Sequence, residues 1–350
     1  MNLKHYLIAI TLCAPYLLSL LGCKNHQDAN ERDLLTIHIK DYENKTIPRP
    51  AVISNIDTIE LDTHGYFMSD IKTVCISDTM AYVADRANTV WAFKYPSGDF
   101  VRRIQKMGHG NGEYVSARTI TYEDGLLYLM DSDTRTILIY DSELNYKSSF
   151  HYGFPALDFI KVQDGFLFLN LIATDNLHRI VHTNDKGEVQ QSYLPSEMSL
   201  DMIFNEKAFV RDKDGEVYIF PPFSNEVYRW TSEGPVLAIQ TDFGKNNPKE
   251  NVKSSYEITE SQRAFNTNFF IVGQYLVNNF FYLGKNYYAF YNLKNNSQYQ
   301  GVVDTTATIP FVPRWQSDKS LIGFMPTADS KKWKPQKDSC DAALFVFHLK

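Results

Sequence analysis

Apolar and polar residues alternate along most of the chain with the period of two that a β-strand requires. Residues 35–40 (LTIHIK) and 56–62 (IDTIELD) show the pattern clearly. Successive side chains of a strand point to opposite faces, so the alternation predicts strands with one buried face. Most other segments are short apolar runs broken by Gly, Asn and Asp, which is typical of strands joined by tight turns.

Helical periodicity is scarce in this sequence. The best candidate for a helix is Tyr256 to Phe265 (YEITESQRAF), with Ser255 as its N-terminal cap. Nearer the C-terminus, residues 278–291 predict a hairpin around Gly284, and further strands are expected at 321–324 and 344–347. The pattern therefore predicts an all-β protein.

One strand–turn–strand unit recurs. Residues 74–85 (VCISDTMAYVAD) match residues 120–131 (ITYEDGLLYLMD), because Asp78 and Asp124 lie 46 positions apart, as do Tyr82 and Tyr128. Two further copies start at Asp164 and Asp214, so the spacings are 46, 40 and 50 residues. Each copy has an aromatic residue four positions after the Asp, where it can pack between neighbouring sheets.

A repeat of this length, with three or four strands in each unit, is typical of the blades of a β-propeller. In the turn, Asp bonds to its own backbone, and Gly reaches a positive φ without a Cβ clash. Four clear units plus about two more in the last third predict six four-stranded antiparallel blades. We expect N- and C-terminal strands to close the ring. Five or seven blades, or a two-sheet sandwich, are the alternatives.

Composition narrows the class. Apolar residues make up 44% of the 350 residues and charged residues 22%, which excludes disorder for most of the chain. The formal net charge is −6. A nucleic-acid-binding protein normally carries a basic surface, so we expect no nucleic-acid partner.

The N-terminus predicts export and lipidation. Residues 6–22 carry no charge and end in Leu20-Leu21-Gly22-Cys23, which resembles the bacterial lipobox. In that motif the Cys thiol is acylated and the chain is cut before it. We therefore expect a signal peptide at 1–22 and a lipid on Cys23. The alternative is an uncleaved anchor, for which the run is short.

The segment after the lipobox is polar. Residues 23–33 (CKNHQDANERD) cannot bury a core and are expected to form a tether, so a single propeller domain would cover 34–350. We expect lipid anchoring in the bacterial envelope, at the outer membrane. The sequence leaves open whether the protein faces the periplasm or the cell surface.

The lipobox, the strand at 56–61 and the loop 108–114 (GHGNGEY) together resemble the six-bladed β-propeller lipoproteins of Bacteroidetes, which are relatives of NHL and TolB-type propellers. The family loop reads approximately G-[RK]-G-P-G-E-[YF], from which His109 and Asn111 depart. The final strand, 342–350, also resembles the family. The resemblance implies the fold and export, and it implies little about activity.

Candidate ligand-binding residues follow the repeat. Asp85 and Asp131 stand directly after the second strand of the first two units, at a level where propeller loops line one mouth of the channel. The full candidate set is Asp85, Arg86, His109, Arg118, Tyr122, Asp131 and Arg135. The alternative is that the Asp side chains only cap loop amides.

Other motifs carry less chemistry. The glycines of loop 108–112 lack the rest of a nucleotide fingerprint, so we expect a connection between blades. His178 and His182 lie four residues apart, but in a strand that spacing is about 13 Å, too far for one metal ion. No metal site and no catalytic set are predicted.

Two functions remain open. The first is a non-catalytic binding or scaffold lipoprotein for a glycan, peptide or envelope protein. The second is a hydrolase or lyase acting on a glycan or small ester at the channel mouth, the only case in which a cofactor, Ca²⁺, is expected. Cys75 and Cys340 either form a disulfide across the ring closure or remain free thiols.

Overall fold

The structure is a computed structural model of the 350-residue chain. It describes residues 34–170, 177–196, 207–248, 254–304, 306, 308–326 and 340–350. Residues 34–350 form one compact unit. The predicted signal peptide (1–22), the predicted lipidation site Cys23 and the predicted tether (23–33) lie outside the described residues.

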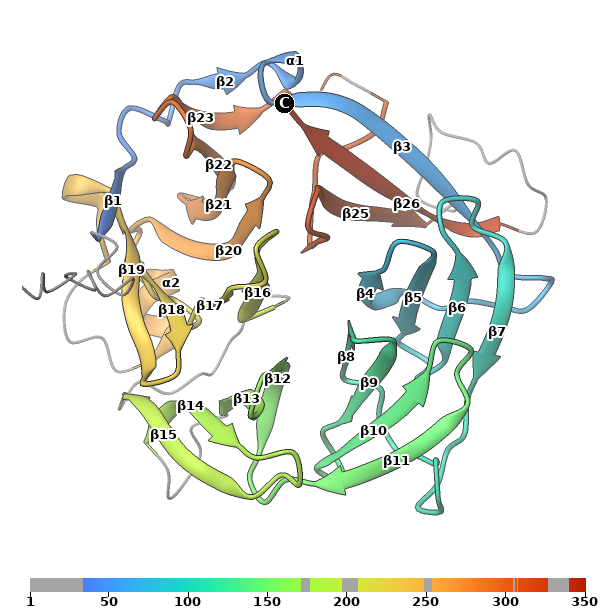
Figure 1. Cartoon of the computed structure of the whole chain (residues 1–350). Coiled ribbons are helices and arrows are strands. Elements are labelled where there is room, and N and C mark those ends of the chain that lie inside the picture. Colours follow the sequence, from blue (N-terminus) through green and yellow to red (C-terminus); the bar gives the residue numbers. More distant parts are fainter. Residues whose placement is uncertain are drawn as a thin grey trace, which may run out of the picture. The chain divides into compact units, whose positions relative to one another are not determined.

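Six blades, each with four antiparallel strands, lie around a common axis, and a further N-terminal strand extends the sheets of blades 4 and 5 (Figure 1). Blade 1 comprises β4 (Ile71–Ile76), β5 (Met80–Asp85), β6 (Val90–Lys94) and β7 (Phe100–Ile104). Blade 2 comprises β8 (Thr119–Glu123), β9 (Leu126–Asp131), β10 (Thr136–Asp141) and β11 (Tyr146–His151). Blade 3 comprises β12 (Ala156–Val162), β13 (Gly165–Asn170), β14 (His178–Thr183) and β15 (Val189–Pro195).

The second half of the chain supplies three more blades, so the predicted six-bladed propeller is confirmed. Blade 4 comprises β16 (Phe209–Arg211), β17 (Val217–Ile219), β18 (Glu226–Thr231) and β19 (Gly234–Asp242). Blade 5 comprises β20 (Phe265–Val272), β21 (Tyr275–Tyr282), β22 (Lys285–Asn292) and β23 (Gln298–Val303). Blade 6 comprises β24 (Trp315–Gln316), β25 (Ser320–Pro326), β26 (Cys340–Leu349) and β3 (Ile53–Asp62).

The two ends of the described chain meet in blade 6. Strand β3 pairs antiparallel with β26, so that Ile59 lies opposite Leu344 and Ile56 opposite Phe347. The N-terminal segment thus supplies the outermost strand of a blade whose other strands come from the C-terminus. This arrangement confirms the predicted closure and leaves no open edge between the first and last units.

The segment before β3 adds two strands to the propeller: β1 (Leu35–His38), which the pattern at 35–40 predicted without indicating its partner, and β2 (Thr46–Ile47), which the pattern did not predict. Strand β1 pairs parallel with β19 at the outer edge of blade 4. Strand β2 pairs parallel with β23 at the outer edge of blade 5, and helix α1 (Arg49–Val52) leads from it into β3. Residues 34–62 therefore contact three blades in succession, and we call them the N-terminal strap.

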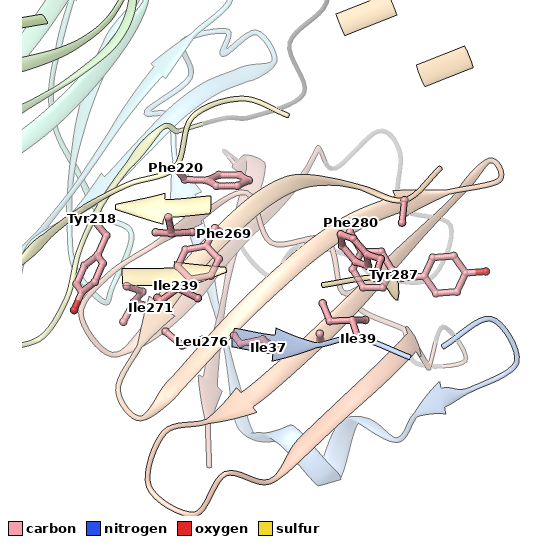
Figure 2. Close-up of a cluster of buried hydrophobic side chains, with 14 of the residues drawn as sticks. Ile37, Ile39, Tyr218, Phe220, Ile239, Phe269, Ile271, Leu276, Phe280 and Tyr287 are labelled. Atoms are coloured by element: carbon pink, nitrogen blue, oxygen red, sulfur yellow. The ribbon is translucent and has the colours of Figure 1, made fainter. Parts of the chain in front are cut away.

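The strap is buried where it crosses blades 4 and 5. Ile37 and Ile39 pack into the apolar cluster between these blades, beside Leu276 (Figure 2). Tyr42 is 1% exposed and sits edge-on to Phe280, with ring centroids 4.9 Å apart. Burial of such large side chains fixes the strap to the propeller.

The aromatic residue of the repeat packs between blades as expected. It faces the following blade in three copies, which contribute Tyr82, Tyr128 and Tyr218. The third copy differs, since Phe168 faces the preceding blade. In blade 3 the two turn residues between paired strand ends are Gln163 and Asp164, so the Asp is the second of them, whereas in blade 2 Asp124 is the first. The following strand is therefore shifted by one residue, which reverses the face on which its side chains lie.

The helices are short. The predicted helix at 256–265 is α2 (Ser255–Glu260), whose cap is Ser254, with its hydroxyl oxygen accepting from the Glu257 N–H at 3.2 Å. The helix ends early because Phe265 begins β20. A 3-10 turn, η1 (Gly244–Asn246), precedes it. In the described part of the chain, no helix has the length and apolar character to cross a membrane.

Candidate functional site

A cavity of about 160 Å³ lies in the channel between the innermost strands of the six blades. These strands are β4, β8, β12, β16, β20 and β24, and every one of them contributes to the lining. Representative lining residues, one from each blade in order, are Cys75, Tyr122, Phe159, Arg211, Phe270 and Gln316. The cavity is thus a property of the closed ring rather than of any single blade.

Lys207 crosses the channel at the end where the innermost strands begin. Its Nζ donates to Thr119 Oγ1 at 2.6 Å, to the Ile120 carbonyl at 3.1 Å and to Asp158 Oδ1 at 3.1 Å. These three bonds use all the donors of an ammonium group. One side chain thereby ties blades 2, 3 and 4 together and narrows this end of the channel.

Arg211 lies at the opposite end of the channel, where the innermost strands finish, and bonds to other blades there. Its Nε lies 3.2 Å from Glu123 Oε2, while Nη2 donates to the Lys161 carbonyl at 2.7 Å and Nη1 to the Gly215 carbonyl at 2.9 Å. Since Arg211 and Glu123 are each the last residue of an innermost strand, the pair joins blades 4 and 2 across blade 3.

Glu123 presents a half-buried carboxyl group to the cavity. Burial raises its pKa above the usual range, and the neighbouring guanidinium of Arg211 acts in the opposite direction. A carboxyl with a raised pKa in a cavity is a candidate for ligand binding or proton transfer.

Gln316 satisfies backbone groups on two other blades. Its Nε2 donates to the Ile271 carbonyl at 2.8 Å and to the Arg211 carbonyl at 3.1 Å, and its Oε1 accepts from the Ile271 N–H at 2.8 Å. The amide of Gln316 therefore fixes blades 4, 5 and 6 to one another inside the channel.

Cys75 contributes a thiol to the cavity wall. Burial raises the pKa of this thiol to about 12, although Lys207 nearby lowers it. A thiol is a nucleophile only as thiolate, so Cys75 is unreactive at neutral pH. The structure also corrects the disulfide alternative. Cys75 in β4 of blade 1 and Cys340 in β26 of blade 6 are both free thiols.

Asp85 and Asp131, two of the residues predicted to bind ligand, are fully buried beneath loops. The Asp85 carboxylate accepts from the Thr89 N–H at 2.9 Å and from the Trp91 indole at 3.1 Å. The Asp131 carboxylate accepts from the Val115 N–H at 2.7 Å, and from Ser116, Asp133 and Thr134. Both carboxylates therefore organise the loops at the Lys207 end.

The other five candidates do not form one cluster. Four are exposed at loops of the Lys207 end, namely Arg86, His109, Arg118 and Arg135. Arg86 lies 3.7 Å from Asp70, and Arg118 donates to the Leu157 carbonyl at 3.3 Å. Tyr122 lies near the opposite end, because it is the fourth residue of β8. It lines the cavity and stacks on Tyr82 with ring centroids 5.2 Å apart.

The glycine-rich loop connects blades 1 and 2, as predicted. Glu113 folds back so that its Oε2 accepts from the Gly110 N–H at 2.9 Å, and Gly112 has a φ of +73° against Tyr146. His178 and His182 both lie in strand β14. Among the residues that the structure describes, no group of three or more His, Cys, Asp or Glu side chains could hold a metal ion.

Sequence reasoning missed the residues that shape the cavity, chiefly Glu123, Lys207, Arg211 and Gln316. Glu123 and Arg211 each directly precede the Asp that opens a turn, at Asp124 and Asp212. A charged residue at the last position of an innermost strand was therefore the available signal. The repeat did not indicate which residue of another blade this charged residue contacts.

The fold and the channel define a six-bladed β-propeller protein with a central cavity. The chain belongs to the family described as a domain of unknown function, DUF4934, whose model matches residues 34–343. No curated protein shows a significant sequence match to the chain.

Solved structures share the fold. The chain is similar to a protein of Bacteroides fragilis named as exported, with a TM-score of 0.71 and 14% identity over 90% of this chain and 99% of that one. It is also similar to a member of the DUF4221 family from Bacteroides vulgatus, with a TM-score of 0.54 and 10% identity over 85% and 97% of the two chains. At these identities the likeness shows the fold alone.

Proposed function

We propose that the protein is an exported lipoprotein, anchored in the bacterial envelope through Cys23, whose propeller binds a glycan, a peptide or a protein partner without catalysis. Two features support export: the lipobox, and the similarity in fold to a Bacteroides protein named as exported. The outer-membrane location is part of the proposal, which leaves open whether the protein faces the periplasm or the cell surface.

The channel cavity is the observation that carries the binding role. Its wall combines aromatic side chains, such as Tyr122 and Phe270, with the polar groups of Glu123 and Gln316. Apolar walls with a few fixed polar groups are typical of ligand sites. Its volume, about 160 Å³, is below the roughly 300–1,000 Å³ of sites that bury a drug-sized molecule. A small ligand, or one part of a larger partner, fits better.

The state of the cavity side chains supports binding over catalysis. The ammonium donors of Lys207 are all bonded to protein oxygens, and the Cys75 thiol is protonated at neutral pH. Arg211 is committed to Glu123 and to two carbonyls. The polar groups are thus already fixed in position, which suits recognition.

One observation favours the alternative, a hydrolase or lyase acting on a glycan or small ester. Glu123 faces the cavity with a pKa that burial raises, and a carboxyl group with a raised pKa is the kind of group that acts as a general acid. Under this alternative Glu123 would protonate the leaving group. The described residues do not fit the Ca²⁺ expected with this alternative, because they offer no group of three or more His, Cys, Asp or Glu ligands.

Glycan and peptide arrays probed with the detergent-solubilised full chain test the proposal. Ser317 lines the cavity, whereas Lys319 lies in the same turn and is exposed. We expect the wild type and Lys319→Trp to retain the same ligand and Ser317→Trp to lose it. Equal retention by both variants would refute the channel site. Mass spectrometry of the eluted ligand decides between the functions, since chemical change that depends on Glu123 would indicate an enzyme.

A further inference from the structure

The innermost strand of each blade has one edge on the channel, and alternate residues direct their N–H and C=O groups into it. In blade 1 the Ser77 N–H bonds to the Met80 carbonyl at 2.8 Å, so these two residues form a hydrogen-bonded pair. The next pair, Ile76 and Ala81, is then a non-hydrogen-bonded pair, in which the backbone groups of Ile76 point away from β5. Ile76 therefore offers an N–H and a C=O to the channel.

In the other blades, too, the pair next to the hydrogen-bonded pair that closes the turn identifies the residue whose backbone groups face the channel. These residues are Tyr122 in blade 2, Lys161 in blade 3, Arg211 in blade 4 and Ile271 in blade 5. The side-chain bonds agree with this assignment, because they reach the backbone groups of Lys161, Arg211 and Ile271 from other blades.

These bridges satisfy one side of the channel and leave the other open. Arg211 bonds to the channel-facing carbonyl of blade 3, and Gln316 bonds to those of blades 4 and 5. Within the described part of the chain, no comparable bridge reaches Ile76 or Tyr122. Both residues line the cavity, and their strands β4 and β8 are neighbours around the ring. Backbone groups in such a site bond to water or to a ligand.

The open edge has the pattern that an extended peptide recognises. Val74 and Ile76 lie two residues apart on β4, so each presents an N–H and a C=O to the same side at a repeat of about 7 Å. An extended peptide places its own donors and acceptors at the same repeat, which is the basis of strand addition. Lys207 bonds across blades 2, 3 and 4 at one end of the cavity, and Arg211 spans the same blades at the other, so the cavity would take a chain end rather than a through-going chain.

Charge at the end where the innermost strands finish favours a basic ligand. The turns between the first and second strands carry acidic residues on five blades: Asp78, Asp124, Asp164, Asp212, Asp214 and Asp318. The same turns carry two lysines, Lys213, which is paired with Asp214, and Lys319. Arg211 lies at the same end and is paired with Glu123, so the acidic side chains remain in excess. An acidic ring around a narrow opening attracts cations and raises their local concentration.

We propose that the channel cavity binds the end of a basic peptide in extended conformation, with its backbone bonded to β4 and β8 at Ile76 and Tyr122. This inference rests on the proposed binding function and names its ligand class. It places the backbone contacts on blades 1 and 2 and the attraction for positive charge at the acidic turns.

Calorimetry on the full chain in detergent tests the inference with defined probes. We expect Ala-Lys-Ala to bind and Ala-Glu-Ala to bind at least about tenfold more weakly, a difference of about 1.4 kcal/mol. The same tripeptide methylated on the lysine backbone nitrogen keeps its charge and loses one donor, so it should also bind at least about tenfold more weakly. Spermidine measures charge alone, and chitotriose represents a glycan.

Two variants complete the test. Ile76→Pro removes the channel-facing N–H and no ladder bond to β5, so it should weaken Ala-Lys-Ala about tenfold. Asp78→Asn/Asp318→Asn changes exposed turns and should weaken the salt dependence of binding without affecting the fold. Equal affinity for the methylated and unmethylated peptides, or for spermidine, would overturn the peptide contact. Binding of chitotriose but not of the peptides would overturn this inference and leave the binding function intact.

Discussion

The imidazole Nε2 of His348 lies 2.7 Å from Oδ2 of Asp57, although 291 positions separate the two residues in the chain. The other ring nitrogen lies 2.9 Å from Ser320 Oγ. The three residues come from β26, β3 and β25 of blade 6. A Ser, a His and an Asp joined by hydrogen bonds suggest a hydrolytic triad. Ser320 is only 2% exposed, however, so it cannot reach a substrate. The set instead joins the strands that close the ring.

Loss of the closing strand should abolish cooperative unfolding. Deleting residues 344–350 removes most of the pairing of β26 with both β25 and β3, and exposes two strand edges. Calorimetry should then show a broad transition of much smaller enthalpy. The milder Asp57→Asn should cost about 1 kcal/mol or less, because the Asp57 side chain is 46% exposed. A deletion variant that still melts sharply at the wild-type temperature would contradict the closure.

Gly112 should tolerate substitution less well than Gly125. Both have a positive φ, +73° and +79°, which costs an alanine about 1–2 kcal/mol. A Cβ on Gly112 would lie 2.9 Å from Tyr146 Cγ, whereas a Cβ on Gly125 meets nothing within 4 Å. Urea unfolding should therefore show a larger loss of stability for Gly112→Ala than for its control Gly125→Ala. Equal losses would mean that the loop moves freely away from Tyr146.

Asp131 should stabilise the fold in a pH-dependent way. Burial raises the pKa of its carboxyl group, but hydrogen bonds from Val115, Thr134 and Ser116 outweigh this and leave the pKa lowered. A group with a lowered folded-state pKa contributes fully above its unfolded pKa of about 3.9, and the contribution is lost as pH falls through the folded value. Asp131→Asn should cost about 2 kcal/mol at pH 7. The difference from wild type should shrink below pH 4. A difference independent of pH would contradict the role of the charge.

The thiols of Cys75 and Cys340 should be free, and that of Cys75 should react slowly. Thiol counting on denatured, unreduced protein cleaved before Cys23 should find two. In the folded protein, alkylation of Cys75 at pH 8 should be several orders of magnitude slower than in a free peptide, because a pKa of about 12 leaves very little thiolate. The rate should continue to rise between pH 9 and pH 11. A plateau near pH 9 would contradict the raised pKa.

Cys23→Ala should release the protein from the membrane. The lipobox assigns the acyl chains to this thiol, and stable anchoring requires more than one chain. Fractionation should find the wild type in the membrane pellet after a carbonate wash and the variant in the supernatant. Retention of the variant in the pellet would support the uncleaved anchor instead.

The repeat made the fold predictable, because each blade solves the same packing problem with similar residues. The turn at Asp124-Gly125 and the aromatic residue four positions after each Asp are visible locally in the sequence. The turn joins neighbouring strands, and the aromatic residue packs between blades. The pairing of Ile59 with Leu344 was also predictable, since a propeller must join its ends.

The strap and the cavity were not predictable in the same way. Leu35 lies opposite Ile239, and nothing in the pattern at 35–38 specifies which blade edge receives it. Glu123 and Arg211 read as ordinary charged residues beside a turn until the ring brings them within 3.2 Å. Asp85 and Asp131 stand at a repeated position because in blades 1 and 2 this carboxylate accepts hydrogen bonds from loop amides.

The N-terminal strap has a consequence for when this protein can fold. Residues 34–62 are synthesised before any of the blades they join, yet their partners β19, β23 and β26 are made later, the last of them at the C-terminus. Blade 6 cannot form until the chain is finished, and blades 4 and 5 lack their outer strands until the strap docks. Contacts between such distant residues slow folding. The strap should therefore remain available to proteases and chaperones throughout translation, and the native ring should appear only after the whole chain has been released.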